Sequence, residues 1–224
     1  MDNNYIVTYG YRRPAFRLTP VAHFFGILAI VLLLVWLLHY RGGIEFDSDN
    51  PNRVFNVHPF LMFAGFIFLS GEAMMAFKTV IAQGKVRKIV HMILHVLAIV
   101  LGIIGLCAVF KFHDMQNYED MFSLHSWLGM GTFCLYLIQW VFGLVVFMPP
   151  DSQGRKDRVR PWHITGGRAL LFMSICTALT GLIQKAGFLQ LTHGNELRLI
   201  NFTAISILLF GIFVDMSVVL GRYV

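Results

Sequence analysis

Six long apolar stretches divide the sequence, and short polar segments separate them. A helix rises about 1.5 Å per residue, so about 20 apolar residues cross the roughly 30 Å hydrocarbon core of a bilayer. The apolar residues run continuously, without the alternation that marks the strands of a membrane β-barrel. The pattern therefore predicts an all-α integral membrane protein with six spans, at about residues 19–40, 57–79, 89–110, 123–147, 161–184 and 198–220.

Composition supports the membrane assignment. The 224 residues are 57% hydrophobic and 13% charged, with a mean hydropathy of +0.66. Soluble domains carry about a quarter charged residues, so this chain is too apolar for water. The first stretch is too long for the core of a signal peptide, and no small-residue cleavage site follows it. Tails and loops are short, so we expect residues 1–224 to form one transmembrane domain.

The distribution of charge predicts the orientation. The net charge of +6 could suggest nucleic-acid binding in a soluble protein, but here the cations cluster at one side of the predicted spans. That side would hold both termini and the second and fourth loops, with Arg12, Arg13, Arg17, Lys78, Lys85, Arg87, Lys88, Arg155, Lys156, Arg158, Arg160, Arg168 and Arg222. Cytoplasmic loops are enriched in Lys and Arg, so we expect both termini in the cytosol.

Four histidines fall at matched depths. His58 and His125 begin the second and fourth spans, which enter from the outer side, whereas His91 and His163 begin the third and fifth spans, which enter from the cytosol. Imidazole is a common axial ligand of haem iron, and helix bundles hold such cofactors in their cores. The pattern predicts two bis-histidine haems, one near each membrane face. No Cys-x-x-Cys-His occurs, so the haems would be non-covalent b-type groups.

Other uses of these histidines are possible. A single histidine at a helix end is usually an interfacial polar residue, although four at matched depths are a less ordinary coincidence. A metal transporter would add carboxylates at the same depth, yet the only acids within the spans are Glu72 and Asp215, both toward the cytosolic side. His95 lies one turn beyond His91 on the same helix face and competes with it as the inner ligand.

Several short motifs together resemble the cytochrome b561 family, and most closely its plant members. They are His39–Gly43, Phe55–Pro59, Gly71–Ala73, Phe112–His113, Ser123–Trp127 and Pro161–His163. The resemblance extends over almost the whole chain after about residue 20. The resemblance implies six helices, with spans two to five around two haems b held by His58, His91, His125 and His163. Related sequences can carry glutamine or asparagine at the position of His95, which favours His91 as the ligand.

The resemblance also implies a function. Electrons would pass from cytosolic ascorbate through both haems to monodehydroascorbate or ferric chelates on the non-cytoplasmic side. The protein would be a homodimer in the vacuolar/endosomal or plasma membrane. Two alternatives remain: the haem-bearing membrane subunit of a quinone-linked dehydrogenase, and a histidine-lined metal transporter. Many relatives have tyrosine where this chain has Phe122, so an outer substrate contact through a phenol hydroxyl is in doubt.

Candidate substrate contacts follow from charge and position. Cations near His91 and His163 would attract the ascorbate anion, and we expect Lys85, Lys88, Arg155 and Arg158 among them. Positive-inside topology alone would also place cations there. On the outer side, His113 ends the third span and would hydrogen-bond an ascorbyl hydroxyl, accept its proton as the electron moves, or ligate a metal ion. The alternative is an interfacial histidine without substrate contact. Arg41 is a further anion-binding candidate on that face, although a haem propionate or a lipid is an alternative partner.

Overall fold

The computed structural model describes residues 3–150 and 153–220, with side chains from Leu18 onward, and all regular secondary structure in these ranges is helical. Six helical segments are long and apolar enough to cross a membrane, which confirms the predicted all-α fold with six spans. These segments are Leu18–Tyr40, Pro51–Thr79, Gly84–Gln116, Leu124–Phe147, Gln153–Phe188 and Asn195–Leu220.

Two of the spans contain wider π-helical turns. The first span consists of α1 (Asn3–Val35) and η1 (Trp36–Tyr40), and the second of α2 (Pro51–Phe60), η2 (Leu61–Phe68) and α3 (Leu69–Thr79). The remaining helices are α4 (Gly84–Gln116), α5 (Leu124–Phe147), α6 (Gln153–Phe188) and α7 (Asn195–Leu220). Pro59 lies inside α2 just before η2, and a proline removes one donor from the helical hydrogen-bond ladder.

Four of the helical segments extend further than the predicted apolar stretches, and the first and fourth match them to within one residue. Polar residues set several of the ends. The second span begins at Pro51, where the Asn50 side chain accepts a hydrogen bond of 3.0 Å from the backbone N–H of Asn52. Ser123 and Ser126 form a capping box at the start of α5. At its C-terminal end, α4 stops at Gln116, and the capping residue Asn117 takes a positive φ of 53°. These ends carry the chain past the apolar core into polar surroundings.

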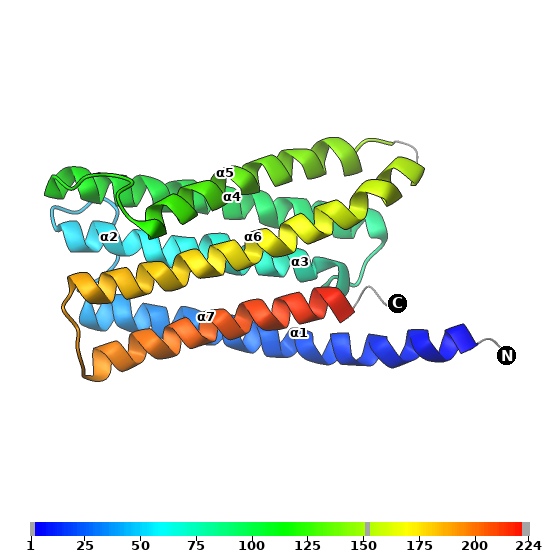
Figure 1. Ribbon diagram of the computed structural model, residues 1–224, viewed down its shortest axis with the longest axis horizontal. Coiled ribbons are helices and arrows are strands. Elements are labelled where there is room, and N and C mark those ends of the chain that lie inside the picture. The colour runs from blue at the N-terminus through cyan, green and yellow to red at the C-terminus, as the bar shows by residue number, and fades with distance from the viewer. Residues whose placement is uncertain (1–2, 151–152, 221–224) are drawn as a thin grey trace.

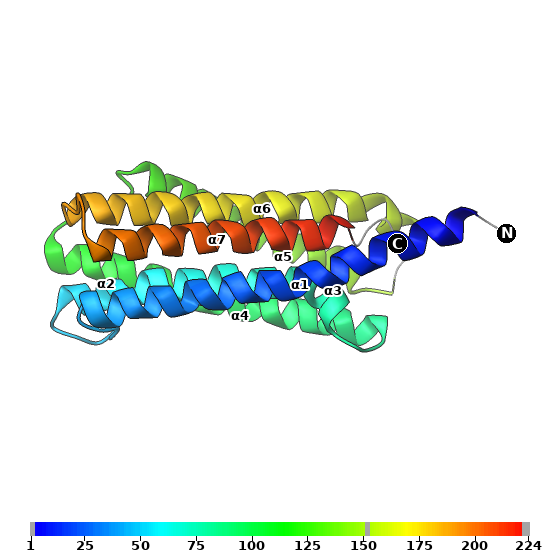
Figure 2. The ribbon, with the colours of Figure 1, turned by 90° about the horizontal axis from the view of Figure 1, so that it is seen from below.

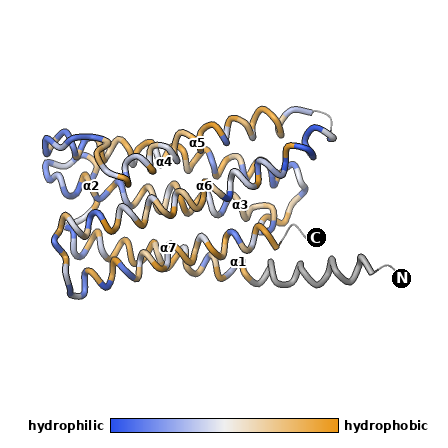
Figure 3. The backbone as a smooth tube through the Cα atoms, in the orientation of Figure 1, coloured by the Kyte–Doolittle hydropathy of each residue, from blue (hydrophilic) through white to orange (hydrophobic). Residues whose placement is uncertain are grey.

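The six spans form two groups. Helices α2 and α3 pack on α4, and α5 packs on α6, whereas α1 packs mainly on α7 along one side of the molecule (Figures 1 and 2). Apolar residues dominate the middle of the helices and hydrophilic residues gather at the two ends (Figure 3). We call the end where α1 begins and α7 ends the inner end, and the opposite end, where α2 and α5 begin, the outer end.

The two carboxylates that the sequence placed within the apolar stretches, Glu72 and Asp215, both have partners. Glu72 of α3 lies 2.9 Å from the Nε2 atom of His23 in α1. Asp215 of α7 binds Arg168 of α6 through two contacts of 2.5 and 3.0 Å. Because charged groups in hydrocarbon require a partner, these pairs tie α1 to α3 and α6 to α7.

Close helix packing at Gly71 gives a test of the fold. A Cβ atom at Gly71 would lie 2.4 Å from Cζ of Phe210, a fully buried ring. Overpacking of this kind costs about 1–3 kcal/mol, so we predict that Gly71→Ala lowers the thermal unfolding midpoint in detergent. Gly131→Ala, where a Cβ meets nothing within 4 Å, is the matched control and should unfold like the parent protein. Equal midpoints for all three proteins would contradict this packing.

Candidate functional site

Two cavities lie inside the helix bundle, one toward each end. The outer cavity has a volume of about 770 Å³ and the inner cavity about 510 Å³. Both volumes are in the range typical of cofactor sites, about 300–1,000 Å³. Each cavity contains two of the four histidines that the sequence selected, namely His58 and His125 in the outer cavity and His91 and His163 in the inner one.

The outer histidine rings come from α2 and α5 and face each other. The ring centroids of His58 and His125 lie 6.1 Å apart, with the planes at 88°. Nδ1 of His58 lies 3.0 Å from the carbonyl oxygen of Gly105, and Nδ1 of His125 lies 2.9 Å from that of Thr177. A carbonyl can only accept, so each Nδ1 carries the proton and donates it. Each Nε2 is then left with a free lone pair.

The inner histidine rings come from α4 and α6 and have a similar arrangement. The centroids of His91 and His163 lie 6.3 Å apart, with the planes at 67°. Nδ1 of His91 donates to the carbonyl oxygen of Ala73 at 2.7 Å. The side-chain amide of Gln139 holds the His163 ring, lying 3.1 Å from its Nδ1 while it donates to the His163 carbonyl oxygen at 2.6 Å.

His95 has a different environment from His91. Its Nδ1 is hydrogen-bonded to the hydroxyl of Tyr136, which also lies 2.7 Å from the hydroxyl of Ser70. Its ring packs edge-on against His91 at a centroid distance of 4.4 Å. The polar contacts of His95 therefore lead toward the middle of the bundle, and the geometry favours His91 as the ring that is paired with His163.

Glycines leave room beside one ring of each pair. A Cβ at Gly181 would lie 2.6 Å from Cε1 of His125, and one at Gly143 would lie 2.9 Å from Cε1 of His163. Side chains at these positions would push the rings out of place.

Four cations line the inner cavity. Of the eight cations that the sequence placed in the two facing inner loops, those lining the cavity are Lys78, Lys88, Lys156 and Arg160. Lys88 was a predicted contact, whereas Lys85, Arg155 and Arg158 do not appear among the described lining residues. Helical periodicity explains Lys88, Lys156 and Arg160, because positions three or seven residues before His91 or His163 share its face. That signal would have favoured Lys156 and Arg160 over Arg155 and Arg158. Lys78 comes from a different helix, α3.

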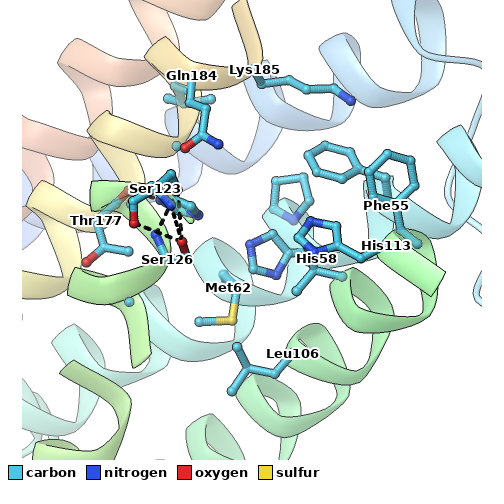
Figure 4. Close-up of a pocket in the computed structure, with 18 of the residues that line it drawn as sticks. Phe55, His58, Met62, Leu106, His113, Ser123, Ser126, Thr177, Gln184 and Lys185 are labelled. Carbon is cyan, nitrogen blue, oxygen red and sulfur yellow. Dashed lines mark hydrogen bonds between the residues drawn. The ribbon is translucent and has the colours of Figure 1, made fainter. Parts of the chain in front are cut away.

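Polar groups at the outer cavity differ from the expectation in one respect. His113 lines the cavity (Figure 4). Its Nδ1 lies 2.6 Å from a carboxylate oxygen of Asp120. Arg41 instead forms an ion pair of 2.5 Å with Glu196, and it is not among the described lining residues. Lys185 of α6 extends into the cavity, although the sequence gave it no role. Phe122 also lines the cavity and offers no hydroxyl.

Comparisons with known proteins agree with this architecture. The sequence model of eukaryotic cytochrome b561 matches residues 57–189, which include both cavities' histidine pairs. An Oryza sativa subsp. japonica protein named "Probable ascorbate-specific transmembrane electron transporter 1" is 43% identical over 86% of this chain and 85% of its own length. The transmembrane ascorbate ferrireductase 1 of Arabidopsis thaliana is 42% identical over 91% and 87%, respectively. A transmembrane ascorbate-dependent reductase of Mus musculus is 37% identical over 84% and 77%.

Proposed function

Because the chain belongs to the eukaryotic cytochrome b561 family, we propose that it transfers electrons from ascorbate across a membrane through two haem b groups. The observation that carries the proposal is the pair of facing histidines at each end of one bundle, with ring centroids 6.1 and 6.3 Å apart. His58 and His125 would hold the outer haem, and His91 and His163 the inner one.

The residues present fit these groups. A metal bonded to two opposed imidazole nitrogens at about 2 Å each separates the ring centres by on the order of 6 Å, as in both pairs. The carbonyl contacts of His58, His91 and His125 fix the tautomer that leaves Nε2 free, as in many metal-ligating histidines. When bound, a haem with two imidazole ligands supplies one-electron redox chemistry and leaves no open coordination site for oxygen.

At the inner end, this chain's cations would bind the electron donor. Ascorbate is an anion at neutral pH, and Lys88 and Arg160 lie at the cavity that contains His91 and His163. Charge-assisted hydrogen bonds from these groups would hold the anion beside the site. The cation-rich inner end would face the cytosol together with both termini. The vacuolar/endosomal and plasma membranes both suit this orientation.

At the outer end, His113 would take part in the return of a proton. Monodehydroascorbate becomes ascorbate by gaining one electron and one proton, and an imidazole is suited to supply that proton. Asp120 lies against Nδ1 of His113, so Nε2 is the atom left for exchange with the substrate. Ferric chelates would be alternative acceptors that need no proton. We propose a homodimer as the functional unit, as the family resemblance implies.

The ligand assignment predicts selective haem loss. His91→Ala or His163→Ala should remove the inner haem, and His58→Ala or His125→Ala the outer haem, because each pair is formed by different helices. Haem content in the purified protein should fall by about half in each case, and one of two low-spin spectral components should disappear. His95→Ala should retain both components. An inner site that is emptied by His95→Ala and kept by His91→Ala would move the ligand by one turn.

The inner docking site predicts a graded loss of ascorbate binding. Lys88→Ala and Arg160→Ala should each raise the ascorbate concentration needed for half-maximal haem reduction by roughly tenfold, the effect of one charge-assisted hydrogen bond. Lys85→Ala should have a smaller effect, because Lys85 is not among the residues lining the inner cavity. Stopped-flow reduction at several ionic strengths measures this. A larger effect for Lys85→Ala than for Lys88→Ala would place the docking site elsewhere.

The proposed role of His113 is tested by two variants of the outer site. His113→Ala should keep both haems but slow the oxidation of reduced protein by monodehydroascorbate, since the proton-exchanging ring is lost. Asp120→Asn should give a smaller slowing, because the ring remains but loses its orienting carboxylate. Stopped-flow oxidation with a ferric chelate is the internal control and should change little. Parental rates with monodehydroascorbate in both variants would remove His113 from the reaction.

A further inference from the structure

Lys185 stands apart from the other cations of the outer end. It lies near the end of α6, is half-buried, and lines the outer cavity together with His58, His113 and His125. Figure 4 shows its side chain extending from α6 over this part of the cavity. The outer side carries few cations, so the positive-inside bias does not account for a lysine at this depth.

Two aromatic rings hold the ammonium group in place. Nζ of Lys185 lies 3.7 Å from the ring centroid of Phe55 and 5.4 Å from that of Phe112. The two rings also pack on each other, with centroids 5.0 Å apart. A cation over an aromatic face is attracted by the negative centre of the ring, and the attraction grows when water is excluded. The charge of Lys185 is therefore positioned by its surroundings.

No acceptor oxygen balances this charge in residues 3–150 and 153–220. Three neighbouring outer cations have carboxylate partners, since Arg41 binds Glu196, Arg53 binds Glu45, and Lys111 binds Asp47. An ammonium group carries three N–H donors, and a buried charge without a partner is costly. The donors of Lys185 are thus available to an oxygen atom inside the outer cavity.

We propose that Lys185 is the anion-binding residue of the outer cavity, where it holds an anionic oxygen close to the histidine pair. This inference rests on the proposed function. The oxygen belongs either to a carboxylate side chain of the outer haem or to an anionic electron acceptor such as monodehydroascorbate. Lys185 takes the role for which the sequence had suggested Arg41, whose guanidinium group is bound to Glu196.

The test compares Lys185→Gln and Lys185→Arg with Lys111→Gln, which removes an outer cation that lies over Phe46 and binds Asp47. Haem content, the midpoint potential of the outer haem, and oxidation of ascorbate-reduced protein are measured for each. Two oxidants are used, ferricyanide as an anion and hexaammineruthenium(III) as a cation. Normal haem content and reduction by ascorbate in the parent protein establish the proposed function separately from this inference.

The two sources of the oxygen give different results. If the substrate supplies it, Lys185→Gln raises the half-saturating ferricyanide concentration about tenfold, and oxidation by the cation is unchanged. If the haem supplies it, Lys185→Gln lowers the outer haem's midpoint potential, because a cation nearby favours the reduced, less positive iron. Lys185→Arg restores most of either property. An unchanged potential and unchanged kinetics in Lys185→Gln, or equal changes in Lys111→Gln, would overturn the proposal.

The parent protein offers a check that does not depend on a variant. If Lys185 binds an anionic acceptor, added salt weakens the reaction with ferricyanide and leaves the reaction with the ruthenium cation unweakened. If Lys185 binds a haem carboxylate, dissolved salt does not reach this contact, so the rates with both oxidants depend on salt only through the overall charge of the protein. In that case the lowered midpoint potential of the outer haem in Lys185→Gln identifies the haem as the source of the oxygen. The proposal is contradicted for both sources of the oxygen if salt slows oxidation by the ruthenium cation more than oxidation by ferricyanide and the midpoint potential of Lys185→Gln is unchanged.

Discussion

The absence of water in the hydrocarbon core is the constraint on which the rest of the structure depends. Every polar group at that depth needs a partner supplied by the protein. His58, His91 and His125 meet this requirement by donating from Nδ1 to backbone carbonyls on other helices. Those contacts set the direction of each ring and leave its Nε2 with a free lone pair. Hydrogen bonds between helices thus hold these three histidine rings in fixed orientations in the two cavities.

The helices fall into two groups with different roles. The spans α2–α3, α4, α5 and α6 supply the four histidines, whereas α1 and α7 pack together along one side (Figure 1). The polar pairs His23–Glu72 and Arg168–Asp215 connect this side to the bundle. Between the two cavities, the rings of Phe66 and Tyr136 pack at 4.6 Å, so the space between the histidine pairs is filled with protein.

The sequence predicted the fold and the sorting of the four histidines into two pairs, for identifiable reasons. Long apolar runs define membrane spans with little ambiguity, and alternation of span direction sorts His58, His91, His125 and His163 by depth. Side-chain contacts across the bundle were not predictable in this way. The pairing of His23 with Glu72, the contact of Asp120 with His113, and the position of Lys185 over Phe55 depend on helix rotation and loop paths. The loop sequences have no hydrophobic periodicity from which these contacts could be predicted.

The central claim is that two bis-histidine haems connect the ends of this bundle. Its most direct test is the absorption and paramagnetic resonance spectrum of the purified protein, recorded before and after addition of ascorbate alone. The account predicts a haem content of about two per chain, two distinguishable low-spin ferric signals, and reduction of both by ascorbate without a partner protein. A single haem, a high-spin ferric signal, or haems that ascorbate does not reduce would contradict it.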